Sequence, residues 1–165
     1  MTIDPGFREL YERDFAVVFR AVYLMCGDRQ LAEDATQEAF ARALARWRRL
    51  HGQPWAAGWV TTTAFNVARR QLRRRPSVAA GPEALQESAH DERLDLHAAI
   101  RALPARQQEA VALHYLLDLP VAQTAAAMDC DEGTVKSHLH RARSALNRAL
   151  HEIDPDDEPT RSTHG

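Results

Sequence analysis

Apolar residues recur at helical spacing along most of this chain, and no segment alternates apolar and polar residues as a strand does. The clearest case is a stripe at positions i, i+4, i+7, i+8 and i+11, which is formed by Tyr11, Phe15, Val18, Phe19 and Val22. Amphipathic helices bury such stripes by packing against one another. The sequence therefore predicts an all-α fold.

The first two predicted helices meet at Gly27 and Asp28. Glycine commonly follows the last residue of a helix, and aspartate commonly caps the first turn of the next one. The second predicted helix covers residues 28–50. Phe40, Leu44 and Trp47 mark its buried side, whereas Asp34, Gln37 and Glu38 lie together on a different face.

A third helix is predicted after the break LHGQP, because proline suits a first helical turn and Pro54 stands there. The helix runs to the arginines near residue 75. Gly58 is unusual within it, since a glycine inside a helix costs about 1 kcal/mol relative to alanine.

A change in composition divides the chain into two small helical domains. The first domain covers residues 1–75. Residues 76–92 are rich in proline, small and acidic residues, which is typical of a flexible linker. Shorter helices follow in a second domain at 93–150, and we expect the acidic tail at 151–165 to be disordered.

Charge is distributed unevenly along the sequence. The chain has 21 Lys and Arg against 23 Asp and Glu, a formal net charge of −2, which argues against a generally basic nucleic-acid coat protein. Two basic patches stand out against this background: ARRQLRRRP at 68–76, and residues 133–150, where no acidic residue occurs. The pattern predicts two separate anion-binding surfaces.

Residues 119–146, LPVAQTAAAMDCDEGTVKSHLHRARSAL, have the pattern of a helix–turn–helix. Pro120 begins the first helix, and Asp131 is placed to cap the second. Small side chains on the first helix predict a close approach of another helix; they are Ala122, Ala125 and Ala126.

The second helix of this pair has two distinct faces. Val135, Leu139 and Ala142 recur at i, i+4 and i+7 and are predicted to point inward. The side chains left facing outward are Lys136, Ser137, His140 and Arg141. Such a helix fits the major groove of DNA, where a carboxylate would lie against a phosphate. DNA binding therefore explains why acidic residues are missing here.

The arginine patch continues the third helix, which also carries polar side chains able to meet bases or sugars: Thr61, Thr62, Thr63 and Asn66. Arginines alone would give only non-specific affinity for phosphates. Together with the interleaved polar and aromatic residues, they predict a surface for single-stranded or melted DNA.

These segments together resemble a bacterial RNA polymerase sigma factor of the extracytoplasmic-function (ECF) type, within the sigma-70 superfamily. The resemblance covers about residues 7–150. Its most specific part is LPARQQEAVALHYLLDLPVAQTAAAMDCDEGTVKSHLHRARSAL, which is similar to the family's promoter-reading C-terminal domain. AEDATQEAFARAL is similar to the helix that binds the polymerase clamp, and WVTTTAFNVARRQLRRR to the helix that reads the −10 element.

The resemblance implies a function for the matching positions. Contacts to the −35 element, read as duplex, are implied for Thr134, Lys136, Ser137, His140, Arg141 and Arg143. Contacts to the opened −10 element are implied for Thr62, Thr63, Asn66, Arg69, Arg70 and Arg73. Core RNA polymerase would bind Asp34, Gln37 and Glu38, and the loop Leu50–Pro54 would help to cradle a flipped base. Promoter DNA and an anti-sigma factor are the other partners that it implies.

Other interpretations stay open on the sequence alone. The chain could be a stand-alone helix–turn–helix regulator that binds DNA without polymerase. It could also be a helical interaction module in which Asp34–Glu38 is only a solvated face. A metal protein or an enzyme built on the eight histidines is disfavoured, because His138 and His140 are two residues apart on a helix and diverge.

We predict no catalytic activity, no metal and no cofactor, since neither a nucleophile–base arrangement nor a phosphate-cradling glycine loop occurs in the sequence. Cys26 and Cys130 fit no metal spacing and are expected to be buried structural thiols. The first residues lack the pattern of a signal peptide, and no apolar run is long enough to span a bilayer. These features predict a cytoplasmic protein.

Overall fold

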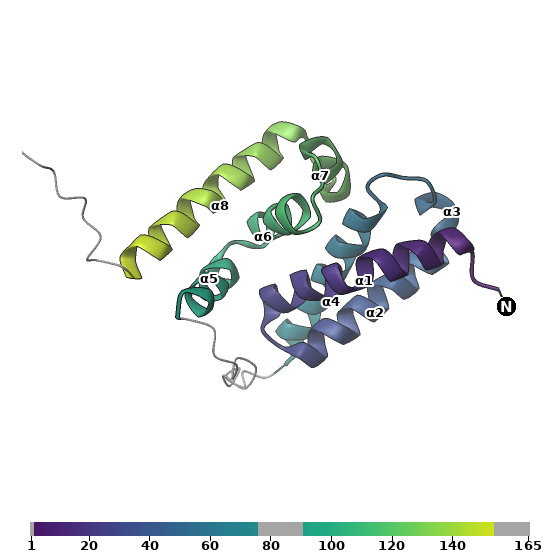
Figure 1. The fold of residues 1–165 in the computed structure, drawn as a ribbon, viewed down its shortest axis with the longest axis horizontal. Helices are drawn as coiled ribbons and strands as arrows, with labels where there is room; N and C mark the ends of the chain where they lie inside the picture. Colours follow the sequence, from purple (N-terminus) through teal and green to yellow (C-terminus); the bar gives the residue numbers. More distant parts are fainter. Residues whose placement is uncertain (1, 76–90, 154–165) are drawn as a thin grey trace, which may run out of the picture.

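A computed structural model describes residues 2–75 and 91–153, and every regular element among them is a helix. The N-terminal half contains α1 (Pro5–Cys26), α2 (Arg29–Ala45), α3 (Trp47–Leu50) and α4 (Ala56–Arg74) (Figure 1). The C-terminal half contains α5 (Asp91–Ala102), α6 (Ala105–Val111), the π-helical turn η1 (Ala112–Leu116), α7 (Val121–Met128) and α8 (Glu132–Ile153). The predicted all-α fold is confirmed.

The predicted linker and tail fall largely outside the described residues, which omit 76–90 and 154–165. Helix α5 begins at Asp91, within the segment that composition assigned to the linker.

The boundary between α1 and α2 follows from the local sequence. Gly27 adopts a left-handed conformation with φ of 70°, and its N–H donates to the carbonyl of Tyr23 at 2.8 Å, which ends α1. The carboxylate of Asp28 accepts a hydrogen bond from the backbone N–H of Leu31 at 2.9 Å and caps α2. Both predicted positions are confirmed.

The second predicted helix is interrupted. Helix α2 ends at Ala45, Arg46 leaves helical geometry with φ of −112° and ψ of 16°, and Trp47 begins the short α3. The prediction that Leu44 is buried was wrong, since this side chain is 43% exposed. Fully buried Ala43 occupies the inner face of α2 instead, and Leu44 lies about 100° further round the helix.

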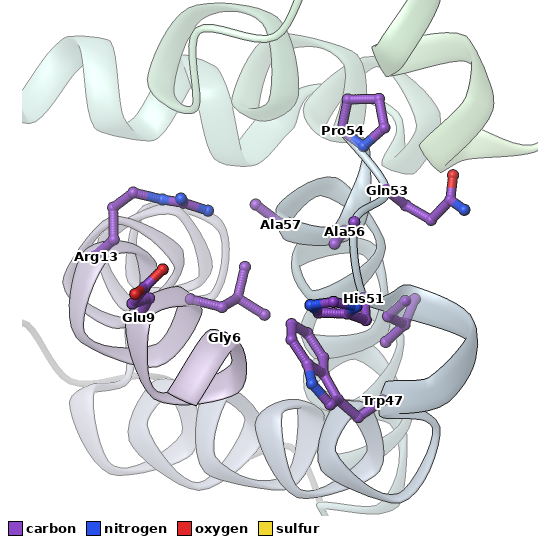
Figure 2. A pocket seen from close by; sticks show the side chains of 12 residues that line it. Gly6, Glu9, Arg13, Trp47, His51, Gln53, Pro54, Ala56 and Ala57 are labelled. Atoms are coloured by element: carbon purple, nitrogen blue, oxygen red, sulfur yellow. The ribbon is translucent and has the colours of Figure 1, made fainter. Parts of the chain in front are cut away.

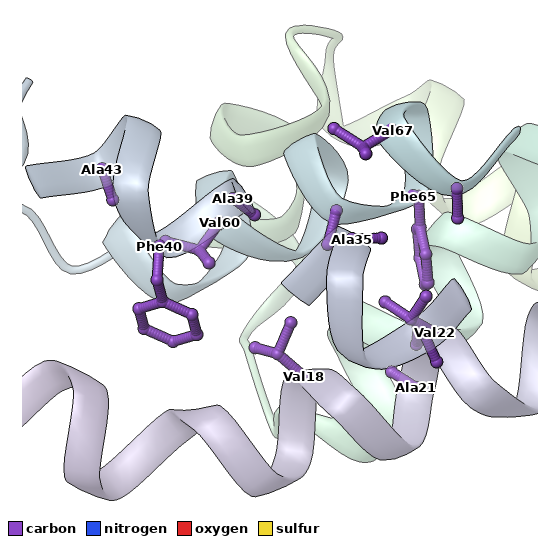
Figure 3. Close-up of a cluster of buried hydrophobic side chains, with 14 of the residues drawn as sticks. Val18, Ala21, Val22, Ala35, Ala39, Phe40, Ala43, Val60, Phe65 and Val67 are labelled. Atoms are coloured by element: carbon purple, nitrogen blue, oxygen red, sulfur yellow. The ribbon is translucent and has the colours of Figure 1, made fainter. Parts of the chain in front are cut away.

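Helices α1, α2 and α4 form the core of the N-terminal half. Phe65 of α4 is 1% exposed and is the largest side chain that this core buries fully. Small residues on α2 allow the other two helices to approach closely. Figure 3 shows side chains from all three helices in this cluster, among them Val18, Val22, Ala35, Ala39, Phe40 and Val60.

A second cluster forms the core of the C-terminal half and contains Ala110, Leu113, Leu119, Ala125, Met128, Val135 and Leu139. The turn between α7 and α8 passes through Asp129, which is left-handed with φ of 54°. The carboxylate of Asp131 then accepts a hydrogen bond from the backbone N–H of Thr134 at 2.7 Å. These contacts confirm the predicted cap.

The burial of the alanines on α7 differs from the prediction. Ala125 is buried in the core, but Ala122 and Ala126 are exposed. The close approach is made by the half-buried Ala127, which faces α4 of the other half of the molecule. The face of α7 that meets another helix is therefore set by the packing of the two halves.

The two halves are packed against each other. Helix α4 contacts α7, while α1 contacts α5 and η1 (Figure 1). Ala112 of η1 is buried in the N-terminal cluster, and the Nε of Arg101 donates to the carbonyl of Leu24 at 3.3 Å. Helix α8 runs along the side of the C-terminal half that faces away from α1 and α4 (Figure 1).

Candidate nucleic-acid and polymerase interfaces

The outward face of α8 carries the side chains predicted to meet duplex DNA. Val135, Leu139 and Ala142 are buried, so the opposite side of the helix is left open to solvent. The predicted residues Lys136, Ser137, His140, Arg141 and Arg143 are exposed, and Thr134 is half-buried. This confirms the predicted orientation of the helix. Contact of these residues with DNA stays a prediction.

His138 lies between the two faces of α8. Burial lowers the pKa of its imidazole, and the guanidinium groups of Arg106 and Arg141 act in the same direction. Its Nδ1 is buried and has no hydrogen-bond partner among the described residues. Both effects favour the neutral form of this imidazole, and Lys136, Arg141 and Arg143 supply positive charge on the exposed side of the helix. Arg143 also donates to the hydroxyl of Tyr115 at 2.8 Å, which ties α8 to η1.

Helix α4 carries the six residues predicted to contact the opened −10 strand, and they differ in accessibility. Asn66, Arg70 and Arg73 are exposed, Thr63 and Arg69 are half-buried, and Thr62 is only 9% exposed. The hydroxyls of Thr62 and Thr63 both donate to the carbonyl of Trp59, at 3.0 and 2.8 Å. Their donor protons are thus used within the helix, and only their acceptor capacity is left for a ligand.

Arg69 is already occupied by the C-terminal half. Its Nη1 lies 2.6 Å from Oε1 of Glu109, and its Nη2 donates to the carbonyl of Ala105 at 2.9 Å. In this arrangement, Arg69 and Thr62 are withheld from DNA, whereas the other predicted −10 residues are accessible.

A pocket of about 450 Å³ lies between the N-terminal turns of α1 and the loop that joins α3 to α4 (Figure 2). All five residues of the loop Leu50–Pro54 line it. Trp47 and His51 form an aromatic wall, with their ring centroids 5.3 Å apart in an edge-to-face arrangement. Glu9 and Arg13 of α1 line the other side. The volume falls in the range of pockets that hold small organic groups.

The predicted polymerase-binding residues lie on the outer face of α2. Asp34 and Gln37 are exposed, and Glu38 is half-buried. The carboxylate of Asp34 accepts from the amide of Gln30 at 3.0 Å, and Glu38 pairs with Arg42 one turn further on. The same face continues through exposed Ala41 to exposed Leu44, so an apolar residue adjoins the acidic and polar ones.

Several residues of these surfaces were missed from the sequence. The sequence did not indicate that Glu109 and Arg106 are involved, because a charged pair on a short amphipathic helix usually faces water. Glu9 and Arg13 were missed because α1 meets the α3–α4 loop only in the folded chain. Leu44 was assigned to the core, although its position next to a predicted binding helix could have suggested a surface role.

Other classes of site are not supported by the described part of the chain. There, no group of three His, Cys, Asp or Glu side chains is placed to hold a metal ion. Cys26 and Cys130 are free and half-buried, and burial raises the pKa of both thiols. Within residues 2–75 and 91–153, none of the helices is both long and apolar enough to cross a membrane.

Two family descriptions and several known proteins are similar to this chain. Residues 10–77 match the family described as Sigma-70 region 2, and residues 93–146 match Sigma-70, region 4. ECF RNA polymerase sigma factor BldN of Streptomyces coelicolor is 34% identical over an alignment 167 positions long, which covers 92% of this chain and 61% of BldN. ECF RNA polymerase sigma factor SigC of Mycobacterium tuberculosis is 35% identical over 136 residues, which cover 76% of this chain and 72% of SigC.

A solved structure shares the fold. It is the sigma factor RpoE from Bartonella quintana in complex with the anti-sigma factor NepR, with a TM-score of 0.69 at 24% identity. The match covers 90% of this chain and 98% of RpoE.

The family matches and the helix–turn–helix define the chain as a sigma-70 family protein. Relatives that are named ECF RNA polymerase sigma factors, and that this chain covers over more than two thirds of their length, show that the chain belongs to that family. It spans about three fifths of the length of BldN.

Proposed function

We propose that this chain binds core RNA polymerase in the bacterial cytoplasm and directs promoter-specific initiation of transcription. In this proposal, α8 reads the −35 element as duplex, and α4 holds the opened −10 element. The observation that carries the proposal is the outward face of α8, which is basic, has no carboxylate between residues 133 and 150 and is supported by a packed helix–turn–helix core.

The −35 element would meet the first turns of α8 in the major groove. Lys136 and Ser137 lie near the start of the helix, where side chains reach base edges. Arg141 and Arg143 lie further along the exposed face. An arginine in this position binds either the O6 and N7 atoms of a guanine or a phosphate.

The −10 element would bind α4 and the adjoining pocket. Unstacking a base from a duplex costs a few kcal/mol, so a pocket that holds the base outside the helix favours melting. The aromatic wall of Trp47 and His51 offers a stacking surface for such a base, and Asn66 and the arginines of α4 would hold the strand.

Polymerase would bind the face of α2 that carries Asp34 and Gln37, with Leu44 as an apolar contact at its end. Each DNA-reading half binds only a short element. Tethering both halves to one polymerase raises the effective concentration of each half at its element. An anti-sigma partner, which the family resemblance implies, stays a prediction.

Run-off transcription with core polymerase and a promoter library tests the function as a whole. We expect productive initiation from templates that share a two-part motif. Sequence-specific binding of the purified chain to duplex operators, with no effect on polymerase, would instead identify a stand-alone regulator.

The polymerase surface has its own test. Asp34→Ala combined with Gln37→Ala should abolish association with core polymerase in co-purification, because it removes two exposed polar side chains from the middle of the α2 face. Glu12→Ala is the matched control, since it removes an exposed carboxylate from α1. Normal association of the double variant would remove α2 from the proposal.

A further inference from the structure

A hydrogen bond between two exposed side chains joins α8 to η1. Nη1 of Arg143 donates to the hydroxyl oxygen of Tyr115 at 2.8 Å, and Tyr115 is 50% exposed. A bond of this kind adds little to the stability of a fold, because water competes for both groups and two long side chains lose freedom when they form it. Its place on the surface is better explained by a ligand that both side chains contact.

The turn η1 holds Tyr115 in a fixed position. Leu113 is fully buried, and two residues later Tyr115 stands at the surface. Nδ1 of His114 donates to the carbonyl of Leu119 at 2.8 Å, and the His114 ring packs edge-on against the Tyr115 ring with centroids 4.9 Å apart. π-Helical turns such as η1 are rare and occur often at functional sites.

The two side chains together offer hydrogen-bond donors to an anion. The guanidinium of Arg143 has five N–H groups, and Tyr115 uses one of them. The oxygen of Tyr115, which accepts that bond, still carries its own proton and can donate it. Arginine N–H and tyrosine O–H groups are both donors to phosphate oxygens in complexes with DNA. A phosphate therefore fits this pair, because all of its exposed oxygens are acceptors.

Arg143 lies at the edge of the exposed face of α8. It follows exposed Lys136 by seven residues, or almost two turns, so both side chains lie on the same side of the helix. It also follows buried Leu139 by one turn, which places it next to the core face. Side chains in the middle of a recognition face point to bases, and those at its edge point to the walls of the groove. The walls are the sugar–phosphate backbones.

The distance along α8 also favours the backbone over a base. Arg143 is eleven residues beyond Glu132, where α8 begins, or ~17 Å along the helix axis. The major groove is about 12 Å wide, and the first turns of a recognition helix are the part that contacts base edges. With those turns in the groove, Arg143 lies beyond its width.

We propose that the hydroxyl of Tyr115 and the guanidinium of Arg143 form a clamp for one phosphate of the −35 duplex. The inference rests on the proposed function and assigns Arg143 to the DNA backbone. Tyr115 holds the guanidinium in place before DNA arrives, so less conformational freedom is lost on binding. A phosphate fixed beside α8 also sets the register in which Lys136 and Ser137 meet the bases.

Two substitutions dissect the clamp in the full chain. Tyr115→Phe removes only the hydroxyl, and Arg143→Gln removes the positive charge; the double variant combines them. Matched controls are Tyr11→Phe and Arg8→Gln, which make the same changes on exposed side chains of α1. The probe is a fluorescent duplex that the parent chain enriches from a random-sequence duplex pool.

Fluorescence anisotropy at several salt concentrations measures the affinity for the duplex. Tyr115→Phe should bind about three- to tenfold more weakly than the parent, which corresponds to the loss of one hydrogen bond. Arg143→Gln should lower the slope of log K against log salt concentration by about 0.9, because one phosphate is no longer neutralised. The double variant should be no more than about twofold weaker than Arg143→Gln, since one phosphate is held by both groups. The two controls should bind as the parent does.

A neutral methylphosphonate in place of single phosphates of the duplex locates the contact. The parent should lose affinity when one particular phosphate is replaced, and both single variants should be insensitive to that replacement. Thermal melts of Tyr115→Phe and Arg143→Gln complete the comparison. If Tyr115→Phe does not fold, the comparison of the parent with Arg143→Gln decides whether a phosphate is bound.

Three results would overturn the clamp. If Tyr115→Phe melts at a lower temperature but binds DNA as the parent does, the hydrogen bond is only a structural link between η1 and α8. If the loss in Arg143→Gln is confined to one base-pair position, Arg143 reads a base. Additive losses in the double variant would show that the two groups do not share a phosphate.

Failure of the proposed function gives a different result. A parent chain that binds every duplex sequence equally would refute recognition of a −35 element by α8. The salt slopes of the parent and Arg143→Gln would still show in that case whether the clamp binds a phosphate.

Discussion

Leu139→Ala and Lys136→Ala together test how α8 divides into a core face and a DNA face. Leu139 is 3% exposed and packs in the C-terminal cluster, whereas Lys136 is exposed one turn earlier on the helix. Both substitutions shorten a side chain of the same helix to a methyl group. Leu139→Ala should lower the stability of the protein, and Lys136→Ala should weaken its binding to DNA.

The expected loss of stability follows from burial. Truncating a fully buried leucine removes apolar contacts and leaves a cavity, with a typical cost of about 3 kcal/mol. A folded unit of roughly 60 residues has a total stability of about 3–9 kcal/mol, so this loss is a large part of the whole. At ~4–8 °C per kcal/mol for a unit of this size, the melting temperature should fall by about 12–24 °C. Lys136→Ala should leave it unchanged, because surface substitutions usually change stability by less than about 0.5 kcal/mol.

Far-UV circular dichroism gives the melting temperatures, and hydrogen exchange of the α8 amides shows whether the loss is in the C-terminal half. Binding to duplex promoter DNA, measured at a fixed salt concentration, completes the comparison. Below its melting temperature, Leu139→Ala should still bind DNA, and Lys136→Ala should bind it more weakly. If Leu139→Ala melts within about 2 °C of the parent, or if Lys136→Ala is equally destabilised, the assignment of the two faces is wrong.

Three further predictions concern single residues. Arg141→Ala should weaken binding by about 1–3 kcal/mol at one −35 position if it reads a guanine, whereas an equal loss on every duplex sequence would identify a phosphate contact. His138 should make the chain less stable as the pH falls below 6.5: its folded pKa lies below this ordinary value, so the unfolded state binds more protons there and the free energy of unfolding decreases. Denaturant titrations at several pH values should show this slope, and His138→Gln should reduce it. Asp28→Ala removes the cap of α2 and should cost about 1 kcal/mol in a thermal melt, an effect that Glu12→Ala should not reproduce.

The helix content and several helix ends were predictable because they depend on residues close together in the chain. A cap such as Asp28 or Asp131 bonds an amide three residues away, and the two faces of α8 follow from the helical period alone. The resemblance to ECF sigma factors was also carried by short continuous segments. The comparisons with known families confirm it.

The predictions of burial from the sequence were wrong for residues at the edge of an apolar helical stripe. Leu44 and Phe40 are one turn apart, yet Phe40 is buried and Leu44 is exposed, because alanines occupy the middle of the inner face of α2. Tyr11 belongs to the apolar stripe of α1 and is nevertheless 40% exposed. The helical periodicity of apolar residues locates the buried face of a helix only within a range of angles. The neighbouring helices determine which residues at the edges of that face are buried.

The sequence by itself therefore determined the helices, their caps, the outward charge of α8 and the family to which the chain belongs. The tertiary structure alone decided that Gly58 lies against Ala127, that Arg69 pairs with a carboxylate 40 residues away, and that α1 completes the pocket beside the loop Leu50–Pro54. The physical reason is the range of the interactions. Helical hydrogen bonds and caps join residues within one turn, whereas contacts between distant segments depend on the shapes of two surfaces that exist only after both have folded.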